Sequence, residues 1–346
     1  MPDLRSASLE RVPIEDKVAV LSRPASYGQE RTERVEVRQT HMAWVFLTDR
    51  LVFKLKKPVR YPFLDFATIA ARLHDCREEV RLNRRLAPDV YLGIEPLTLT
   101  AEGALRLGAH GEVVDWLVVM RRLPAELMLD EVLARGGADM SLIDRLGDRL
   151  ARFYASAERV RPSSPDAYAA RLRAALRETS AELVRPDYGL PGERVATVVG
   201  RQLEFVAREG ELLASRLAEG RVVEGHGDLR PEHVCLEPEP VVIDCLEFNR
   251  DLRLVDALDE LAFLALECAV LGDAEVGARV IGRYRGRSGD RAPERLLGFY
   301  ESFRATLRAR LLARHSLEPG DRAPGFYLER ATDYLDRALA CAGRFA

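Results

Sequence analysis

The chain has 346 residues, of which 47% are hydrophobic, so it is long enough to bury a large core in two domains or lobes. Its net charge of −3 and isoelectric point near 6.2 provide no basic field that would attract nucleic acid or an anionic membrane. It contains neither an apolar run of about 18 residues nor, in residues 1–17, the apolar core of a secretory signal. We therefore expect a cytoplasmic protein with no nucleic-acid or membrane partner. The oligomeric state is left open.

The first part of the chain, residues 1–123, is predicted to form a β-rich lobe with one inserted helix. Residues 13–22 favour a short helix, and β-branched and aromatic runs over residues 34–59 favour two or three antiparallel strands. Apolar residues at helical spacing predict the inserted helix over residues 65–87, with Asp65 as its N-cap. Further strands are expected over residues 90–100, 104–111 and 113–123.

The rest of the chain, residues 124–346, is predicted to be mainly helical. Ser141 and Asp144 form a capping-box pattern at the start of the first of its longer helices. Short strand-like pieces interrupt the helices between residues 224 and 249. The expected helices span residues 141–157, 166–185, 192–219, 256–271, 273–286, 293–315 and 324–343. The whole chain therefore belongs to the α+β class.

Cationic residues are used unevenly. The chain has four lysines against 48 arginines, and three of the four lie in VFKLKKPV, at Lys54, Lys56 and Lys57. Lysine carries a compact, strongly hydrated ammonium, whereas arginine carries a planar fork. A site that holds phosphate with a point charge would account for lysine in this strand, and an exposed basic turn before Pro58 is the alternative. The five cysteines include no CxxC pair, which argues against a disulfide framework.

The stretch EGHGDLRPEHVCLEPEPVVIDCLEFN, residues 224–249, carries two aspartates in positions suited to phosphoryl transfer. Asp228 lies in a loop between strand-like pieces, and Asp244 follows the apolar run PVVI at the end of a predicted strand. Moving a phosphoryl group needs a carboxylate that orients the attacking hydroxyl, a second carboxylate that holds Mg²⁺, and a cation that fixes the phosphates. Asp228, Asp244 and Lys54 are the candidates for these roles.

The same stretch allows other interpretations. His226, His233, Cys235 and Cys245 offer ligands for the zinc ion of a hydrolase, although their spacing lacks the paired knuckle of a zinc site. Residues 224–260 contain eleven acidic residues and three arginines, a local charge of −8 that would attract divalent cations and a cationic substrate. A solvated acidic surface without chemistry is the third interpretation.

With these residues assembled, the sequence resembles the aminoglycoside phosphotransferase-like family, which has the protein-kinase-like fold. HGDLRPEHVCL is similar to the family's catalytic loop, usually HGD, four residues and Asn, and VVIDCLEFN is similar to its metal-binding segment. THMAWVFLTDRLVFKLKKPVRYPFLDF and DCLEFNRDLRLVDALDELAFL are most similar to a bacterial subgroup whose longer members continue into an ATP-binding domain. The resemblance covers residues 10–315, and the GxxxxGK[ST] loop of that second domain is absent from this sequence.

The resemblance implies a role for each residue that matches the catalytic motifs. Asp228 would be the catalytic base and Asp244 the Mg²⁺ ligand. Lys54 would bind the α- and β-phosphates of the nucleotide and pair with Glu79 on the inserted helix. Glu78 is the competing partner, but Glu79 fits the family's helix pattern better.

The resemblance also implies roles where the sequence departs from the family. QTHMAWV replaces the glycine-rich loop, so Thr40 and His41 would cover the phosphates. VVMRRL resembles the hinge, where backbone groups near Met120 and Arg122 would meet adenine. His233 stands in place of the usual Asn, and imidazole suits Mg²⁺ less well than an oxygen ligand does.

The implied activity is transfer of the γ-phosphate of ATP, with Mg²⁺, to a hydroxyl of an aminoglycoside or another small molecule. The alternative is a regulatory pseudokinase that binds nucleotide with little or no turnover. Asp259 resembles an aspartate that braces the catalytic loop in the family, which implies a structural role. Arg304 and Arg308 are expected to lie on a solvated helix face, and the alternative is that they face the substrate cleft.

Overall fold

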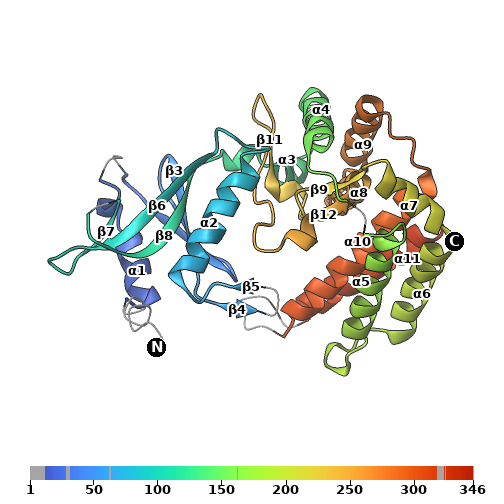
Figure 1. Ribbon diagram of the computed structural model, residues 1–346, viewed down its shortest axis with the longest axis horizontal. Coiled ribbons are helices and arrows are strands. Elements are labelled where there is room, and N and C mark those ends of the chain that lie inside the picture. Colours follow the sequence, from blue (N-terminus) through green and yellow to red (C-terminus); the bar gives the residue numbers. More distant parts are fainter. Residues whose placement is uncertain are drawn as a thin grey trace. The chain divides into compact units, whose positions relative to one another are not determined.

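The computed structural model describes residues 12–28, 32–61, 64–108, 110–161, 163–317, 323 and 325–345. Most of the N-terminal stretch in which a signal was sought, residues 1–11, lies outside these ranges. The described chain forms two compact units (Figure 1). The first takes in residues up to Leu127 together with Val241–Asp251, and the second takes in Met128–Pro240 together with the residues from Leu252 onwards. The segment that carries Asp244 therefore packs with the first unit.

The first unit is built on a six-stranded antiparallel sheet, as the β-rich pattern predicted. The strands lie in the order β1 (Glu36–Gln39), β2 (Ala43–Leu47), β3 (Leu51–Lys56), β8 (Glu112–Arg121), β6 (Tyr91–Leu99) and β7 (Leu105–Leu107). Two short strands, β4 (Arg60–Tyr61) and β5 (Leu64–Asp65), pair separately, and β11 (Val241–Val242) opens the segment that returns to this unit.

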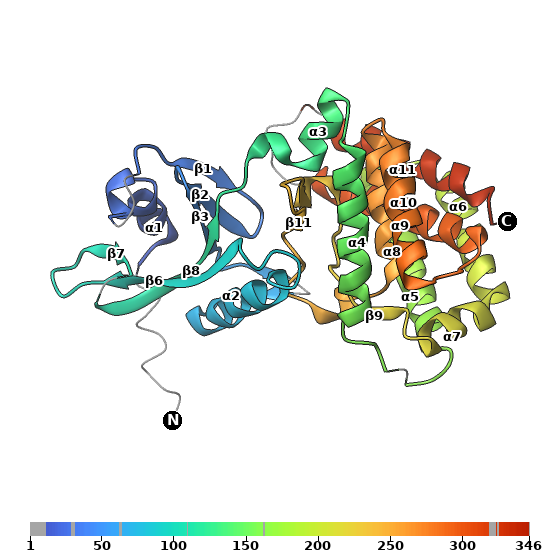
Figure 2. The ribbon, with the colours of Figure 1, turned by 90° about the horizontal axis from the view of Figure 1, so that it is seen from above.

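Two helices cover opposite faces of this sheet, α1 (Ile14–Leu21) and α2 (Ile69–Asn83) (Figure 2). Successive side chains of a strand point to opposite faces, so Phe53 and Leu55 pack in the core beside α1 while Lys54 and Lys56 face α2. Because Lys54 and Lys56 are two residues apart in β3, both side chains point toward the inserted helix.

The start of α2 differs from the prediction. Its N-cap is Thr68, whose hydroxyl accepts a hydrogen bond from the N–H of Ala71 at 3.1 Å. Asp65, the predicted cap, lies instead in β5, and its carboxylate accepts from the N–H of Ala67 at 2.9 Å. The β4–β5 pair thus includes Asp65, the residue at which the prediction began the helix, and α2 begins four residues later at Ile69.

The second unit is mainly helical, as predicted. The N-cap of the helix Met140–Ser156 is Asp139 and not Ser141, and the Asp139 carboxylate accepts from the N–H of Ser141. The helix predicted over residues 192–219 is divided at Glu209 into two helices. The α-helices of this unit are α3 (Leu129–Arg135), α4 (Met140–Ser156), α5 (Ala167–Leu183), α6 (Gly192–Arg208), α7 (Gly210–Ala218), α8 (Ala257–Val270), α9 (Ala274–Ser288), α10 (Glu294–His315) and α11 (Phe326–Ala342).

A short antiparallel pair lies among these helices, formed by β9 (Val222–Glu224) and β12 (Leu254–Asp256). Strand β10 (Val234–Cys235) follows a 3₁₀ turn formed by Pro231–His233. Arg216 of α7 anchors β12, because its guanidinium donates to Asp256 at 2.6 and 2.7 Å. The same guanidinium donates to Asp290 at 2.6 Å. All three side chains are buried.

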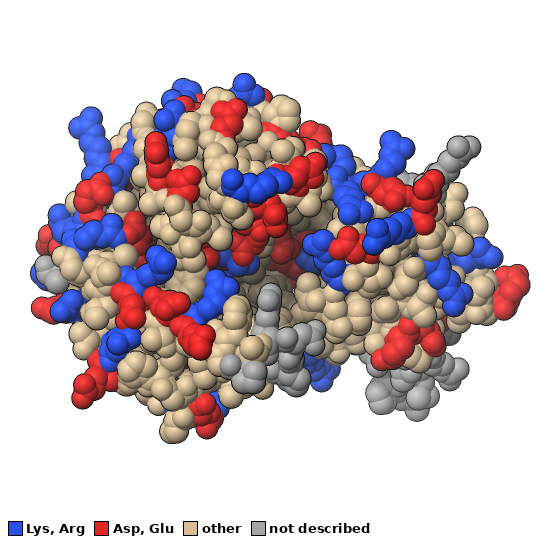
Figure 3. All heavy atoms as spheres, turned by 180° about the vertical axis from the view of Figure 1, so that it is seen from behind, with Lys and Arg blue, Asp and Glu red and all other residues tan. Residues whose placement is uncertain are grey.

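The surface agrees with the absence of a net basic field. Lys and Arg are mixed with Asp and Glu over the described residues of the face in Figure 3, where no continuous basic area forms. Across the described ranges, no helix has the length and apolar character that a membrane span requires.

Candidate active site

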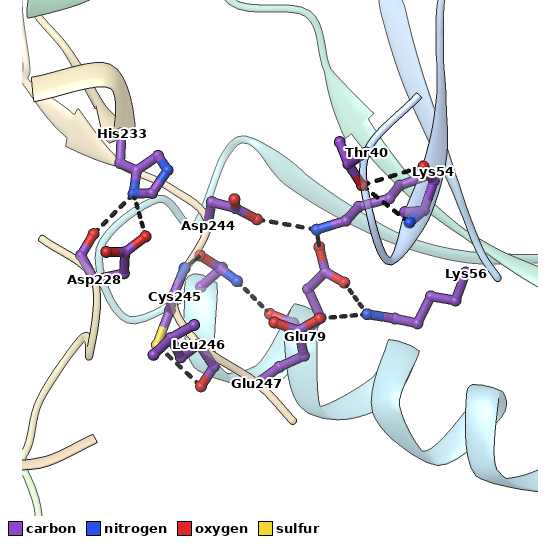
Figure 4. A network of polar contacts seen from close by, with 12 residues as sticks. Thr40, Lys54, Lys56, Glu79, Asp228, His233, Asp244, Cys245, Leu246 and Glu247 are labelled. Carbon is purple, nitrogen blue, oxygen red and sulfur yellow. Dashed lines mark hydrogen bonds and ion pairs between the residues drawn. The ribbon is translucent and has the colours of Figure 1, made fainter. Parts of the chain in front are cut away.

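A cluster of predicted site residues lies within the first unit and is centred on Lys54. Its ammonium donates to Glu79 Oε1 at 2.8 Å and to Asp244 Oδ1 at 2.9 Å (Figure 4). Lys54 comes from β3, Glu79 from α2, and Asp244 from the loop after β11. Three predicted residues that are far apart in sequence are thus in direct contact, and Glu78, the competing partner, instead pairs with Arg81 on the outer face of α2.

The charges at this contact stabilise one another. Burial alone would lower the pKa of Lys54, but the carboxylates of Asp244 and Glu79 outweigh it and raise that pKa well above its ordinary value. Burial acts to raise the pKa of Glu79, yet Lys54 and Lys56 hold it below its ordinary value. Lysine and glutamate are therefore both ionised at neutral pH, which leaves a fixed ammonium available for an anionic ligand.

A second lysine, which the sequence singled out but gave no role, completes this cluster. The ammonium of Lys56 contacts Glu79 Oε2 at 2.6 Å, Asp75 Oδ2 at 2.6 Å and Glu247 Oε1 at 2.5 Å. Asp75, Glu79 and Glu247 are the one group of three or more possible metal ligands within the described ranges. The ammonium of Lys56 lies where a cation would bind, so the lysine itself balances these acids.

Glu247 gives a prediction for the pH dependence of stability. Burial raises its pKa to about 7 from an ordinary 4.5, despite the opposing charge of Lys56. Between these values the folded chain holds a proton that the unfolded chain has released, so Glu247 lowers the free energy of unfolding as the pH rises from about 4.5 to about 7. Glu247→Gln resembles the protonated acid and is expected to remove this decline and to be more stable above pH 7, by up to about 3 kcal/mol.

Urea unfolding of both chains between about pH 5 and pH 8 measures this difference. Glu15→Gln, an exposed change on α1 of the same unit, is the control and is expected to follow the parent. Parallel profiles for the parent and Glu247→Gln would show that Glu247 does not titrate in this range.

The backbone at Asp244 is held in an uncommon conformation. Asp244 has φ 61°, the only positive value at a non-glycine residue of the described chain. Its N–H donates to the hydroxyl of Tyr91 at 3.1 Å, and the next N–H, of Cys245, donates to Asn83 Oδ1 at 2.9 Å. These contacts aim a side chain that is 48% exposed, so its carboxylate is open to solvent on one side while Lys54 contacts the other.

The remaining predicted nucleotide contacts lie at two separate places in the same sheet. Thr40 and His41 form the exposed turn between β1 and β2, where the Thr40 hydroxyl accepts from the N–H of Ala43 at 3.0 Å. Met120 lies in β8 between β3 and β6. The N–H of Arg122 already donates to the carbonyl of Arg50 at 2.8 Å, so an adenine contact at Arg122 is restricted to its carbonyl oxygen. Their roles toward a nucleotide stay predictions.

The second unit carries the predicted catalytic loop. Asp228 Oδ1 lies 3.0 Å from Arg230 Nε, and His233 Nδ1 donates to the Asp228 carbonyl at 2.8 Å (Figure 4). Burial acts to raise the pKa of Asp228, but Arg230 and His233 outweigh it and lower that pKa. Asp228 is therefore an ionised carboxylate at neutral pH, able to accept a hydrogen bond from a hydroxyl.

His233 is oriented by this loop. Nδ1 contacts the Asp228 carbonyl, and the other ring nitrogen, Nε2, lies 3.4 Å from Arg230 Nη2. A metal ion bound at Nε2 would be close to a guanidinium. The predicted role of His233 as a metal ligand is therefore electrostatically less favourable than that of Asp244.

Glu260, not Asp259, braces the catalytic loop. The carboxylate of Glu260 accepts from the N–H of His226 at 3.0 Å and also from the N–H of Gly227 and the hydroxyl of Tyr154. Asp259 instead accepts both guanidinium hydrogen bonds of Arg304 at 2.7 Å. The predicted brace was wrong by one helical position, and Arg304 is buried by this pair instead of lying on a solvated face.

The zinc interpretation gains no cluster from the structure. None of His226, His233, Cys235 and Cys245 belongs to the group of possible metal ligands found in the described residues. Cys235 and Cys245 are buried side chains of the core.

Sequence comparisons match this arrangement to a known family. A profile of the phosphotransferase enzyme family matches residues 45–299. An uncharacterized protein of Mycobacterium tuberculosis is 36% identical over 279 residues, which cover 80% of this chain and 54% of that protein. An uncharacterized protein of Mycobacterium bovis matches to the same extent. The chain thus spans about half the length of the curated relatives it matches.

Solved structures extend the match to the fold. The GDP complex of aminoglycoside 2'-phosphotransferase-IIIa has a TM-score of 0.55 at 14% identity, covering 94% of this chain and 98% of that one. A choline/ethanolamine kinase family protein from Mesorhizobium loti has a TM-score of 0.52 at 15% identity, covering 95% and 98%. A glucosamine kinase in complex with glucosamine, ADP and inorganic phosphate has a TM-score of 0.51 at 16% identity, covering 94% and 85%. The predicted family and fold are confirmed: the chain belongs to the phosphotransferase enzyme family and has the protein-kinase-like fold.

Proposed function

We propose that this chain is an ATP-dependent small-molecule kinase that transfers the γ-phosphate to a hydroxyl group. The family supports phosphotransfer in general, and the contact of Lys54 with both Glu79 and Asp244 carries the more specific proposal. These three side chains supply a fixed ammonium and an exposed carboxylate at one place, as a nucleotide with its counter-ion requires. The proposed nucleotide site is thus assembled from residues of the first unit alone.

Lys54 would hold the α- and β-phosphates. Its ammonium is positioned by Glu79. Because the Glu79 side chain is fully buried, this contact holds the Lys54 ammonium inside the unit and away from solvent. A nucleotide would replace Asp244 as the second partner of Lys54, which frees the Asp244 carboxylate. Thr40 and His41, in the turn between β1 and β2, are proposed to lie over the phosphates, and Met120 and the Arg122 carbonyl are proposed to meet the base.

The donor set at Asp244 fits magnesium. Mg²⁺ prefers carboxylate oxygens and keeps several waters, and the Asp244 carboxylate is half exposed. When bound, Mg²⁺ would neutralise charge on the phosphates. Asp244 would hold the ion, whereas His233 is proposed to position the catalytic loop through its hydrogen bond to the Asp228 carbonyl.

Asp228 would orient the attacking hydroxyl. Its low pKa makes it a weak proton acceptor before the reaction starts, but an ionised carboxylate fixes a hydroxyl well and takes its proton as the bond to phosphorus forms. Arg230 contacts Oδ1 at 3.0 Å and the braced loop fixes the backbone, whereas Oδ2 is 3.8 Å from the nearest His233 nitrogen and would accept from the acceptor molecule.

The structure changes the expectation about the acceptor's charge. Part of the acidic surplus between residues 224 and 260 is neutralised by lysines and arginines from outside this range. The acids paired in this way are Asp244, Glu247, Asp256 and Asp259, whose partners are Lys54, Lys56, Arg216 and Arg304. The local charge of −8 therefore does not by itself select a cationic acceptor, and neutral hydroxyl compounds belong in any test with aminoglycosides.

The test is a nucleotide-consumption screen over aminoglycosides, amino alcohols, sugars and other hydroxyl-bearing metabolites. ATP and GTP are both included, because one structural relative is a GDP complex and another holds ADP. We expect acceptor-dependent release of ADP or GDP, reduced at least about a hundredfold by Lys54→Met. Nucleotide consumption that is unchanged by Lys54→Met would place the activity elsewhere.

A regulatory pseudokinase is the second candidate, and His233 in place of Asn is the observation that favours it. Such a protein would bind nucleotide through Lys54 and show no acceptor-dependent turnover. Equal nucleotide affinity in the parent and in Asp228→Asn, together with no consumption by either, would support it over the kinase.

A further inference from the structure

Lys56 is the residue of this cluster that the proposed function leaves without a role. It is 1% exposed, and its ammonium touches three carboxylates that are themselves buried. Chains of this length rarely bury a lysine so fully unless its charge is matched. The parity of β3 places it on the same face as Lys54, two residues earlier, and both ammonium groups reach the same glutamate.

The two lysines divide Glu79 between them. Oε1 accepts from Lys54 at 2.8 Å and Oε2 accepts from Lys56 at 2.6 Å, so the carboxylate cannot rotate without breaking one contact. With Lys56 absent, Glu79 would keep one of its two lysine contacts, and Asp75 and Glu247 would each lose their contact with this ammonium. The only ammonium left nearby would be that of Lys54, which the buried acids would then compete for.

Lys56 also ties the segment of Asp244 to the helix. Glu247 lies three residues after Asp244, and its contact with Lys56 spans 191 positions of sequence. The N–H of Cys245 is held by Asn83 of α2, so Lys56 and Asn83 fix the segment from both sides of Leu246. A change at Lys56 therefore reaches both the partner of Lys54 and the loop that presents Asp244.

We propose that Lys56 is a positioning residue for the nucleotide site, which acts through Lys54 and not on the nucleotide itself. It locks Glu79 in the rotamer that presents Lys54, and it absorbs the surplus of buried negative charge that would otherwise draw Lys54 away from phosphate. This inference rests on the proposed function, since it requires that Lys54 binds nucleotide.

The experiment is a double-mutant cycle on nucleotide affinity with the full chain. Calorimetric titration with MgADP gives the dissociation constant of the parent, Lys56→Met, Lys54→Met and the double variant. We expect Lys56→Met to raise the dissociation constant at least about tenfold in the parent and less than about twofold in the Lys54→Met background. The inference would be overturned if the double variant raised the dissociation constant by the product of the two single effects. It would also be overturned if Lys56→Met bound MgADP as the parent does.

Lys17→Met is the matched control for loss of a buried ion pair. Lys17 is also buried in the first unit, where its ammonium donates to Asp115 at 2.7 Å and to the Val114 carbonyl at 3.0 Å, away from Glu79. Its variant is expected to lower stability as Lys56→Met does, but to leave the dissociation constant for MgADP within about twofold. A tenfold loss of affinity in Lys17→Met would mean that general destabilisation explains the effect of Lys56.

Two further comparisons separate the possible failures. If Lys56→Met does not fold, Asp75→Asn and Glu247→Gln remove the acids it balances, and the cycle is run in that background with the same expectations. If Lys54→Met binds MgADP as the parent does, the proposed nucleotide site is wrong. If only Lys54→Met weakens binding, the site stands and the role of Lys56 is refuted.

Discussion

Replacing Asp228 by asparagine is expected to lower the rate of phosphate transfer about a thousandfold while nucleotide affinity stays within about twofold. Asparagine fills the same volume and can keep the contact with Arg230, but it carries no charge to orient a hydroxyl or accept its proton. The effect should appear mainly in kcat, because Asp228 would contact only the reacting hydroxyl of the acceptor and not the nucleotide. Single-turnover transfer from labelled ATP measures it directly.

Glu232→Gln is the control for this prediction. Glu232 lies in the same loop, pairs with Arg230 as Asp228 does, and is the more exposed of the two. Its change is expected to alter the rate less than about threefold, as for other exposed ion pairs. A rate above about one tenth of the parent in Asp228→Asn would show that this carboxylate does not assist the attack.

The largest loss of stability is expected for Arg216→Met in the second unit. The guanidinium of Arg216 is the shared partner of Asp256 and Asp290, and its side chain is only 3% exposed. Its removal leaves two buried carboxylates without their cation, one of which also caps α8 through the N–H of Leu258. We expect the free energy of unfolding to fall by about 3–5 kcal/mol, measured by urea unfolding.

An exposed pair in the same unit provides the contrast. Arg295 donates to Glu209 at 3.0 Å, but its side chain is 48% exposed. Arg295→Met is expected to cost less than about 1 kcal/mol. Addition of Asp290→Asn to Arg216→Met should recover part of the loss, because one uncompensated charge is removed. A loss in Arg216→Met as small as that in Arg295→Met would mean that water or a counter-ion reaches the two carboxylates.

The sequence was most informative where local patterns and chemistry agreed. Period-two alternation in β3 and helical spacing in α2 are local properties, and they predicted the strand of Lys54 and the helix of Glu79. The pairing of these two residues was implied by the resemblance to the family and not by the periodicity. The rare use of lysine in an arginine-rich chain marked the strand but did not separate Lys56 from Lys57. Lys56 is buried among three acids, whereas Lys57 donates to the Thr40 carbonyl at the surface.

Contacts between distant positions explain what the sequence could not predict. Nothing in DCLEFN shows that Glu247 turns toward a strand 191 positions earlier, or that distant arginines pair with Asp256 and Asp259 farther along the chain. Asp259 and Glu260 illustrate the same limit within one turn of α8. Adjacent helical residues point about 100° apart, so which acid reaches the loop depends on how the helix is rotated, and the sequence does not specify that rotation.

The left-handed backbone at Asp244 restricts the side chains that this position can carry. Glycine, asparagine and aspartate enter that region at little cost, and only aspartate among them bears a negative charge. Glutamate would keep the charge but strain the main chain, whereas asparagine would keep the turn and lose the charge. Position 244 thus offers a neutral replacement that leaves the loop geometry intact, so that electrostatic and conformational contributions at this corner can be measured separately.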